Sequence, residues 1–175
     1  MLLPLERRLE TLAAGGEEAG LRIGAGELLA DSRHSFKGFA FLHDFAITPN
    51  WALFLQNAIA FNPLPYVTGQ KGAAQCLQSK PGGQAKFWLI PRDSGAFAGQ
   101  PPRILDAPDG FVFHHLNAWE DQGSVVVESI YYSDFPSIGP DQDFRAIDFE
   151  LLPEGLLEQC RIDLHSGTVS TTRLS

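Results

Sequence analysis

The chain has 175 residues, enough for one domain of ordinary size with its own hydrophobic core. Apolar residues make up 44% of it, charged residues make up 19%, and the formal net charge is −8 at pH 7. The 13 cationic residues are scattered singly, whereas a nucleic-acid-binding protein needs a concentrated basic face, so we exclude nucleic acid as a partner. No run of about 18 apolar residues occurs, which excludes a membrane-spanning helix.

Residues 1–20 differ in pattern from the rest of the chain. Three leucines recur at helical spacing, a proline suits the first turn, and a Gly-Gly pair ends the pattern. These features predict a short helix followed by a linker rich in Gly and Glu. The segment lacks a continuous apolar stretch, so it does not resemble a secretory signal. The remainder, residues 21–175, forms a separate β-rich part.

Beyond residue 21 the pattern is that of β-strands, with short alternating or β-branched runs bounded by turns rich in Gly, Pro, Asn and Asp. In chain order the predicted strands are 27–36, 39–48, 51–56, 86–90, 103–107, 111–119, 124–132, 157–164 and 168–174. Irregular segments over 62–72 and 135–154 separate them. This succession of short strands predicts an all-β sandwich, barrel or propeller.

Two cysteines, Cys76 and Cys160, form no C-x-x-C pair and no other metal-binding spacing. Isolated thiols are typical of a reducing compartment, and a disulfide between the two is the less favoured alternative. We therefore expect a cytoplasmic location.

The five histidines occupy two kinds of setting. His34 and His165 lie in polar, turn-like segments and are expected to be ordinary histidines. His43 and His114 lie in strongly apolar runs, Phe-Leu-His-Asp-Phe and Phe-Val-Phe-His-His. An imidazole that faces an apolar interior needs partners for its ring nitrogens, and a metal ion is one such partner. A plain core histidine is the commoner alternative, and Asp44 leaves a triad of two histidines and one carboxylate open.

Two stretches carry a resemblance to a known family. Residues 38–50, Gly-Phe-Ala-Phe-Leu-His-Asp-Phe-Ala-Ile-Thr-Pro-Asn, resemble the H-D-F-x-x-T strand with which carotenoid cleavage oxygenases supply an iron ligand. Residues 111–121, Phe-Val-Phe-His-His-Leu-Asn-Ala-Trp-Glu-Asp, resemble a second signature of that family, F-x-F-H-x-x-N-x-[WYF]-E. Weaker matches extend the resemblance over residues 21–175; they lie at 75–76, 88–92, 143–145, 161–164 and 167–169.

The resemblance implies a fold and an activity. Members of the family are seven-bladed β-propellers, of which residues 21–175 would form roughly two to three blades of antiparallel strands. They bind one Fe(II) on the propeller axis through four histidines and split a double bond of a carotenoid, an apocarotenoid or a stilbene with O2. The resemblance thus implies Fe(II) as the cofactor, and a carotenoid or apocarotenoid together with O2 as the substrates.

The same resemblance assigns the candidate site residues. His43 and His114 match the second and third iron ligands, because the family's ligand stands three residues before the Asn of the second signature. Alternation along a strand then turns His115 to the other face, where we expect a polar partner. Phe41 and Phe45 flank His43 and are candidates for lining the substrate pocket, with plain propeller core as the commoner alternative. No stretch resembles the family's first and fourth ligand histidines.

The leading interpretation is therefore a carotenoid or apocarotenoid oxygenase, present as an incomplete chain with two of its four iron histidines. A lignostilbene-type dioxygenase is the alternative within the family. An inactive truncated remnant and a β-rich module without metal are the alternatives from other classes. The chain alone is expected to be inactive, since two imidazoles hold iron more weakly than four.

Residues 58–67 are unusually apolar for a connection and are expected to form an ordered but irregular loop. Apolar substrates partition into membranes, so one interpretation is that this segment forms the rim of the substrate entrance and contacts the membrane surface. Packing of this segment against a neighbouring blade is an equal alternative.

Overall fold

The computed structural model describes residues 32–80, 82–136, 145 and 147–174. The chain divides into two compact units, residues 1–40 and 41–175, and all strands of the described residues lie in the second unit. The predicted helix within 1–20 and most of the predicted strand 27–36 lie outside the described residues. Residues 32–36 are described and form no strand, so that part of the prediction is wrong.

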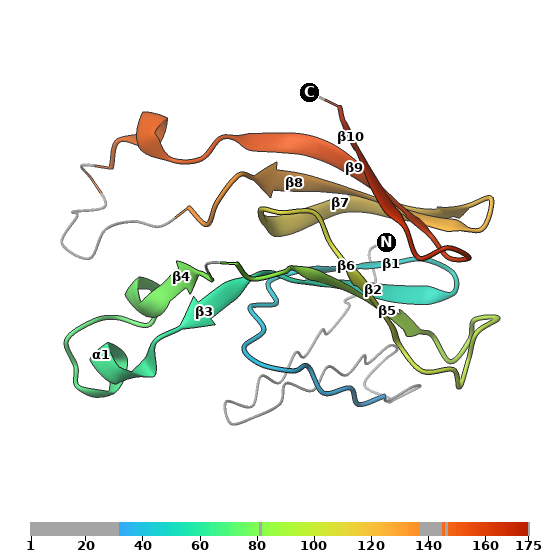
Figure 1. Cartoon of the computed structure of the whole chain (residues 1–175), viewed down its shortest axis with the longest axis horizontal. Coiled ribbons are helices and arrows are strands. Elements are labelled where there is room, and N and C mark those ends of the chain that lie inside the picture. Colours follow the sequence, from blue (N-terminus) through green and yellow to red (C-terminus); the bar gives the residue numbers. More distant parts are fainter. Residues whose placement is uncertain (1–31, 81, 137–144, 146, 175) are drawn as a thin grey trace, which may run out of the picture. The chain divides into compact units, whose positions relative to one another are not determined.

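The first sheet of the second unit holds four antiparallel strands in the order β1-β2-β5-β6 (Figure 1). Its strands are β1 (Phe45–Ile47), β2 (Trp51–Gln56), β5 (Lys86–Pro91) and β6 (Arg103–Asp106). Between β2 and β5 the chain leaves the sheet and forms a two-stranded ribbon with two short helices. These elements are β3 (Ile59–Phe61), α1 (Pro63–Val67), η1 (Ala74–Cys76) and β4 (Leu77–Ser79).

The second sheet is an antiparallel meander in the order β10-β9-β8-β7. Its strands are β7 (Phe111–Asp121), β8 (Ser124–Tyr132), β9 (Gly155–Asp163) and β10 (Val169–Arg173), with the short helix η3 (Phe149–Leu151) before β9. A two-residue turn joins β7 to β8, and both of its residues, Gln122 and Gly123, have positive φ, as a tight hairpin requires. Each sheet has the strand number of one propeller blade, and the predicted all-β class is confirmed.

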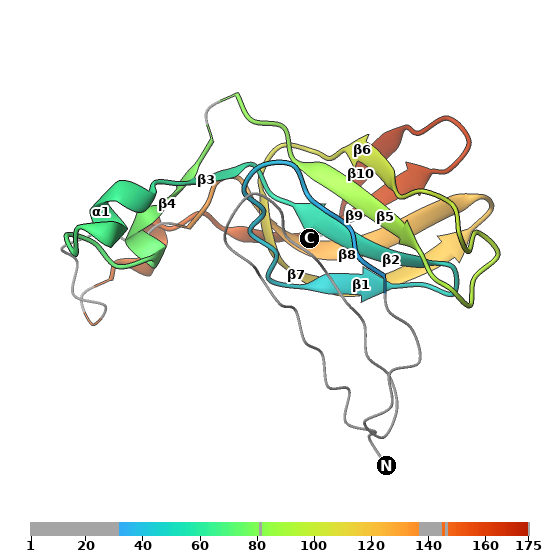
Figure 2. The same cartoon turned by 90° about the horizontal axis from the view of Figure 1, so that it is seen from below.

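The two sheets form two layers around one hydrophobic core (Figures 1 and 2). Alternate residues of each strand face the other sheet, because side chains alternate across a strand. The core side chains that are at most 4% exposed include Trp51, Leu53, Leu55, Phe87, Leu89, Val125, Val127, Cys160 and Ile162. Full burial of a large apolar side chain contributes about 1.5–3 kcal/mol, so this core is the main source of stability. Both cysteines are buried and free.

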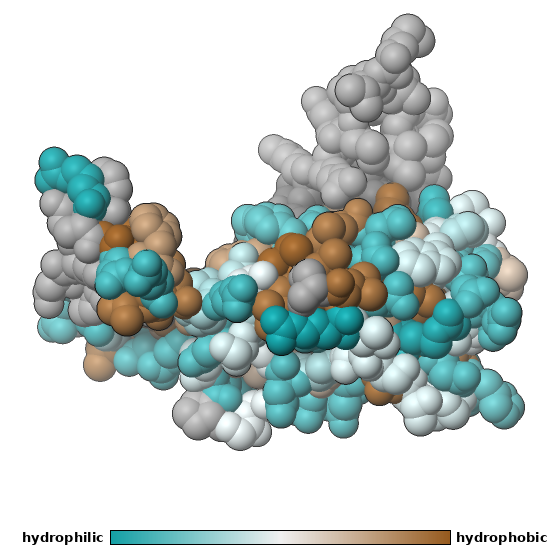
Figure 3. Space-filling model, turned by 90° about the horizontal axis from the view of Figure 1, so that it is seen from above, coloured by the Kyte–Doolittle hydropathy of each residue, from teal (hydrophilic) through white to brown (hydrophobic). Residues whose placement is uncertain are grey.

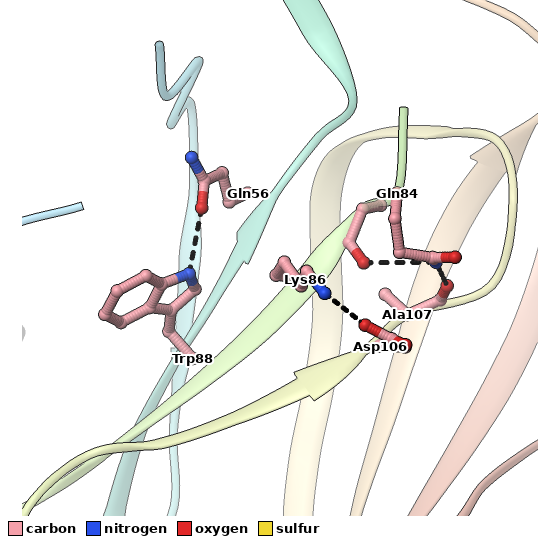
Figure 4. A network of polar contacts seen from close by, with 7 residues as sticks. Gln56, Gln84, Lys86, Trp88, Asp106 and Ala107 are labelled. Atoms are coloured by element: carbon pink, nitrogen blue, oxygen red, sulfur yellow. Dashed lines mark hydrogen bonds and ion pairs between the residues drawn. The ribbon is translucent and has the colours of Figure 1, made fainter. Parts of the chain in front are cut away.

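Polar contacts fix β5 between its neighbours in the first sheet (Figure 4). The indole Nε1 of Trp88 donates to Gln56 of β2 at 3.0 Å, and Lys86 forms an ion pair with Asp106 of β6. Because the ion pair is exposed, its contribution to stability is small. The contact between Trp88 and Gln56 adds a specific cross-strand bond to the backbone ladder.

The segment 58–67 differs from the predicted irregular loop, since it contains β3 and α1. The Asn62 side chain caps α1 by accepting a hydrogen bond from the Leu64 N–H at 3.2 Å, and Pro63 occupies the first helical position. Asn followed by Pro is a helix-start signal, because the amide oxygen satisfies a free N–H and proline needs no partner there. The predicted strand 39–48 is also shorter, since only residues 45–47 pair with β2.

Glu120 of β7 joins the second sheet to the turn that follows β1. Its Oε1 accepts hydrogen bonds from Thr48 Oγ1 at 2.6 Å and from the Asn50 N–H at 2.8 Å, and its Oε2 accepts from Asn50 Nδ2 at 2.6 Å. Burial acts to raise the pKa of Glu120, but these three hydrogen bonds together outweigh it and hold the pKa below its usual value. The carboxylate form therefore fixes the β1–β2 turn against β7.

We expect the substitution Glu120→Gln to lower the free energy of unfolding by about 1 kcal/mol, because one carboxylate oxygen becomes a donor that faces Asn50 Nδ2. The pKa of Glu120 is lower in the folded chain than in the unfolded chain. Its stabilisation is therefore fully present above the unfolded-state pKa and is lost as the pH falls through the folded-state pKa. Urea unfolding of both proteins should show a difference at pH 7 that shrinks in acid, once the pH falls below the ordinary pKa of a glutamate.

The matched control is Glu128→Gln, since Glu128 of β8 accepts a single 3.3 Å bond from Gln159. Equal stability losses for the two variants at pH 7, or a Glu120→Gln loss that persists in acid, would contradict this account of the junction.

Candidate metal centre

The first strands of the two sheets, β1 and β7, lie against each other (Figure 2). His43 stands two residues before β1, and His114 lies in β7. Their imidazole rings are 5.1 Å apart between centroids and nearly perpendicular, at 78°. Both side chains are exposed, so their ring nitrogens are accessible to a further ligand. The two histidines thus lie beside each other, and their role as metal ligands stays a prediction.

Strand β7 is bulged around His114. Val112 pairs with Tyr131 and His115 pairs with Ser129, so two residues of β7 stand opposite one residue of β8. A second shift follows directly, between His115 and Asn117. A bulge bends a strand and re-aims its side chains, and bulges are common beside functional sites.

His115 has a polar partner, as predicted, whereas its expected orientation away from His114 stays a prediction. Its Nδ1 lies 2.7 Å from Ser129 Oγ of the neighbouring strand. Burial is the main cause that lowers the pKa of His115, to about 4; the Asp44 carboxylate opposes this effect and His114 adds to it. The ring is therefore neutral at pH 7 and is held in place between the strands.

The carboxylate of Asp44 binds backbone groups on both sides of the centre. Its Oδ1 accepts from the Phe45 N–H at 2.8 Å, and its Oδ2 accepts from the His115 N–H at 3.0 Å. In the part of the chain that the structure describes, no three His, Cys, Asp or Glu side chains converge as metal ligands. The triad of two histidines and one carboxylate, which the sequence left open, therefore does not form among these residues.

An aromatic cluster of Phe41, Phe111, Phe113 and Phe135 adjoins the histidine pair. The Phe113 ring lies 5.5 Å from His43 and 4.5 Å from Phe111, and Phe41 lies 6.1 Å from Phe113. Phe135, which follows β8, completes the cluster at 5.0 Å from Phe111. One side of the histidine pair is therefore apolar and aromatic.

The structure places the two predicted pocket residues differently. Phe41 belongs to the aromatic cluster, whereas Phe45 is buried and stacks on Phe54 of β2, with ring centroids 5.2 Å apart. The lining role of Phe45 stays a prediction. Sequence reasoning missed Phe113, because simple alternation turns it away from its neighbour His114. The bulge allows both of these consecutive residues to contact His43.

The chemistry of this arrangement follows from its groups. Two exposed imidazoles, one just before β1 and one in β7, are suitable donors for a divalent transition metal. Neutral nitrogen ligands leave the metal's positive charge uncompensated. The adjoining phenylalanines favour an apolar substrate. None of the described helices is long and apolar enough to cross a membrane.

Comparison with known proteins identifies the family to which this chain is similar. The model of the family described as retinal pigment epithelial membrane protein matches residues 15–175. The apocarotenoid-15,15'-oxygenase of Synechocystis sp. is 44% identical over 144 residues, which cover 82% of this chain and 28% of that protein. The zeaxanthin 7,8(7',8')-cleavage dioxygenase of Crocus sativus is 37% identical over 142 residues, which cover 81% of this chain and 35% of the relative.

Solved structures agree with the sequence matches. The cobalt-substituted Synechocystis ACO superposes with a TM-score of 0.78 at 42% identity, over 85% of this chain and 30% of that chain. A chimera of ACO and RPE65 gives a TM-score of 0.77 at the same identity and the same coverage. The chain thus spans about a third of the length of the relatives that it matches. The family match over residues 15–175, together with these relatives, shows that the chain belongs to the carotenoid oxygenase family, that of the retinal pigment epithelial membrane protein.

Proposed function

We propose that this chain is part of an Fe(II)-dependent oxygenase that splits a double bond of a carotenoid or apocarotenoid with O2. The observation that carries the proposal is the convergence of His43 and His114, 5.1 Å apart between ring centroids, beside the aromatic cluster. Relatives whose names specify cleavage of apocarotenoids and zeaxanthin support the substrate class.

The donor set fits the proposed metal. Two nitrogens that each bind one ion at about 2.1 Å lie within about 4 Å of each other, and the observed ring separation is compatible with this distance. Imidazole is a good ligand for iron(II), and one solved relative is a cobalt-substituted protein. His43 and His114 would hold the ion through one ring nitrogen each.

The remaining residues of the site have distinct roles in this proposal. Iron(II), when bound, supplies the chemistry that activates O2. Phe41 and Phe113 would contact the flat apolar polyene and exclude water from the side of the centre on which they lie. The Ser129 hydroxyl binds His115 Nδ1 and ties that ring to β8.

A lignostilbene-type dioxygenase is the second candidate. It is favoured by the isoeugenol monooxygenase of Pseudomonas putida, which is 28% identical over 133 residues and whose name specifies a small phenolic substrate. An aromatic wall beside the histidines suits either substrate class. An inactive remnant of the family is the third alternative, and metal and product analysis distinguishes it from the first two.

We also infer peripheral membrane contact at one end of the second unit. Five large apolar side chains on or beside α1 and η3 are between 52% and 80% exposed: Leu64, Tyr66, Val67, Phe149 and Leu151. Both short helices lie at the same end (Figure 1), and the space-filling view shows apolar side chains there (Figure 3, left). Exposed apolar groups of this kind are typical of interaction sites, and a membrane would deliver an apolar substrate. The cytoplasmic location expected from the isolated cysteines also stays a prediction.

The metal assignment can be tested in a chimera in which residues 21–175 replace the matching segment of the Synechocystis apocarotenoid oxygenase. We expect the chimera to cleave an apocarotenal. His43→Ala or His114→Ala should reduce its activity and iron content by at least about 100-fold, because loss of a ligand exceeds the usual 10–100-fold effect of losing a supporting contact. His165→Ala, in the exposed turn between β9 and β10, is the control and should retain both. Full activity of either ligand variant would exclude the assignment.

The 175-residue chain alone should bind iron at well below one equivalent and should yield no cleaved aldehyde, since its described residues bring together only two imidazoles. Metal analysis of the purified chain, followed by incubation with an apocarotenal under O2, measures both quantities. Stoichiometric iron together with a cleavage product would contradict this expectation.

The membrane inference predicts that the double substitution Leu64→Ser and Val67→Ser reduces co-sedimentation of the chain with liposomes by at least about threefold, because both exposed apolar side chains are lost. Ile104→Ser is the matched control, since Ile104 is an exposed apolar residue of β6. Unchanged co-sedimentation of the double variant would contradict membrane contact through α1. Packing of these side chains against another protein surface would then be the remaining interpretation.

A further inference from the structure

We propose that Asp44 is a positioning residue that aligns the two histidine-bearing segments with each other. This inference deepens the proposed function and rests on it for the presence of the metal. The alignment itself is a property of the polypeptide, so it can be measured without the metal.

The need for such a residue follows from the sheet topology. The strands β1 and β7 lie against each other but belong to different sheets, in which each is the terminal strand. No backbone ladder between them therefore sets their relative register. A terminal strand also presents N–H and C=O groups that need other partners. The distance between His43 and His114 consequently depends on side chains that cross from one strand to the other.

Asp44 makes such a crossing directly beside both histidines. The residue follows His43, and its two oxygens accept the N–H groups of Phe45 and His115 at 2.8 Å and 3.0 Å. One carboxylate thus binds the N–H two residues after His43 and the N–H one residue after His114. Hydrogen bonds from N–H groups to a carboxylate are about twice as strong as those between neutral groups.

The contact of Asp44 with His115 also fixes one end of the bulged segment that contains His114. Asn57, which follows β2, accepts the Val112 N–H at 3.0 Å and donates to the Val112 carbonyl at 2.9 Å. Asn57 and Asp44 therefore hold the two ends of the bulged segment, Val112 and His115, to the first sheet. His114 lies between these two fixed points, so its direction is determined by both of them.

The side-chain chemistry at position 44 is restrictive. Asparagine has one acceptor oxygen, and its amide group would present N–H donors to one of the two backbone N–H groups. Alanine removes both bonds. We therefore expect Asp44→Asn to weaken the alignment and Asp44→Ala to weaken it further.

Nuclear magnetic resonance of the 175-residue chain at pH 7 tests the proposal. In the wild-type chain we expect a nuclear Overhauser effect between the rings of His43 and His114, and a slowly exchanging His115 amide. In Asp44→Ala the ring-to-ring effect should disappear, and exchange of the His115 amide should be at least about tenfold faster while the amides of β8 and β9 remain protected. Asp121→Asn is the matched control. Asp121 lies in β7, as His115 does, but its carboxylate binds the Arg161 side chain, so this substitution should change neither signal.

Several outcomes would overturn the inference. One is a fast-exchanging His115 amide in the wild-type chain, and another is a folded Asp44→Ala variant with both signals intact. If Asp44→Ala does not fold, Asp44→Asn decides: weakening of either the ring-to-ring effect or the His115 protection supports the inference, and retention of both at the wild-type level overturns it. The chimera separates this inference from the proposed function. A His43→Ala or His114→Ala chimera with unchanged iron content and activity would overturn the metal assignment, whereas the ring contact and the amide protection in the metal-free chain would still report on Asp44.

Discussion

The contact between β1 and β7 is the constraint on which the rest of this structure depends. Two four-stranded sheets pack through an apolar core, and hydrophobic attraction has no preferred direction. Directional hydrogen bonds add a fixed register between the two layers. Glu120 binds the turn after β1, Asn57 binds Val112, and Asp44 binds His115. Each of these contacts joins β7 to a residue that adjoins β1 or β2, and together they act at three points along β7.

This arrangement explains why the functional candidates lie in irregular backbone. His43 precedes the paired part of β1, and His114 lies in a bulge of β7. Regular strands would direct neighbouring side chains to opposite faces. Departure from regularity places Phe113 and His114 on the same side of the strand, where both contact His43. The regular strands supply rigidity, and the irregular segments supply the convergence.

The sequence predicts the regular part of this fold well. Strands β2 and β8 have the predicted bounds, because each is a run of β-branched, aromatic or aliphatic residues that ends at a clear turn signal. Strand β3 and helix α1 were missed, although Asn62 and Pro63 form a helix-start signal, because the apolar residues around them match neither strand nor helix periodicity over a sufficient length. The histidine pair was found through two motifs, whereas the bulge that aims His114 depends on pairing with β8 and with the first sheet. The residues around His114 do not by themselves indicate how β7 pairs with other strands, so the bulge could not be predicted from them.

The excursion between β2 and β5 has a consequence for how this fold can vary. Gln56 ends β2 and Lys86 begins β5, and these two residues are direct partners in the sheet. Asn57, the first residue of the excursion, stays bound to Val112, whereas the part beyond it pairs with itself through Phe61 of β3 and Leu77 of β4. The length and composition of the α1 segment between β3 and β4 are therefore mechanically uncoupled from the strands that support the histidines. Relatives can lengthen, shorten or recompose the α1 segment while the scaffold stays the same, so new surface properties can arise there without cost to the centre.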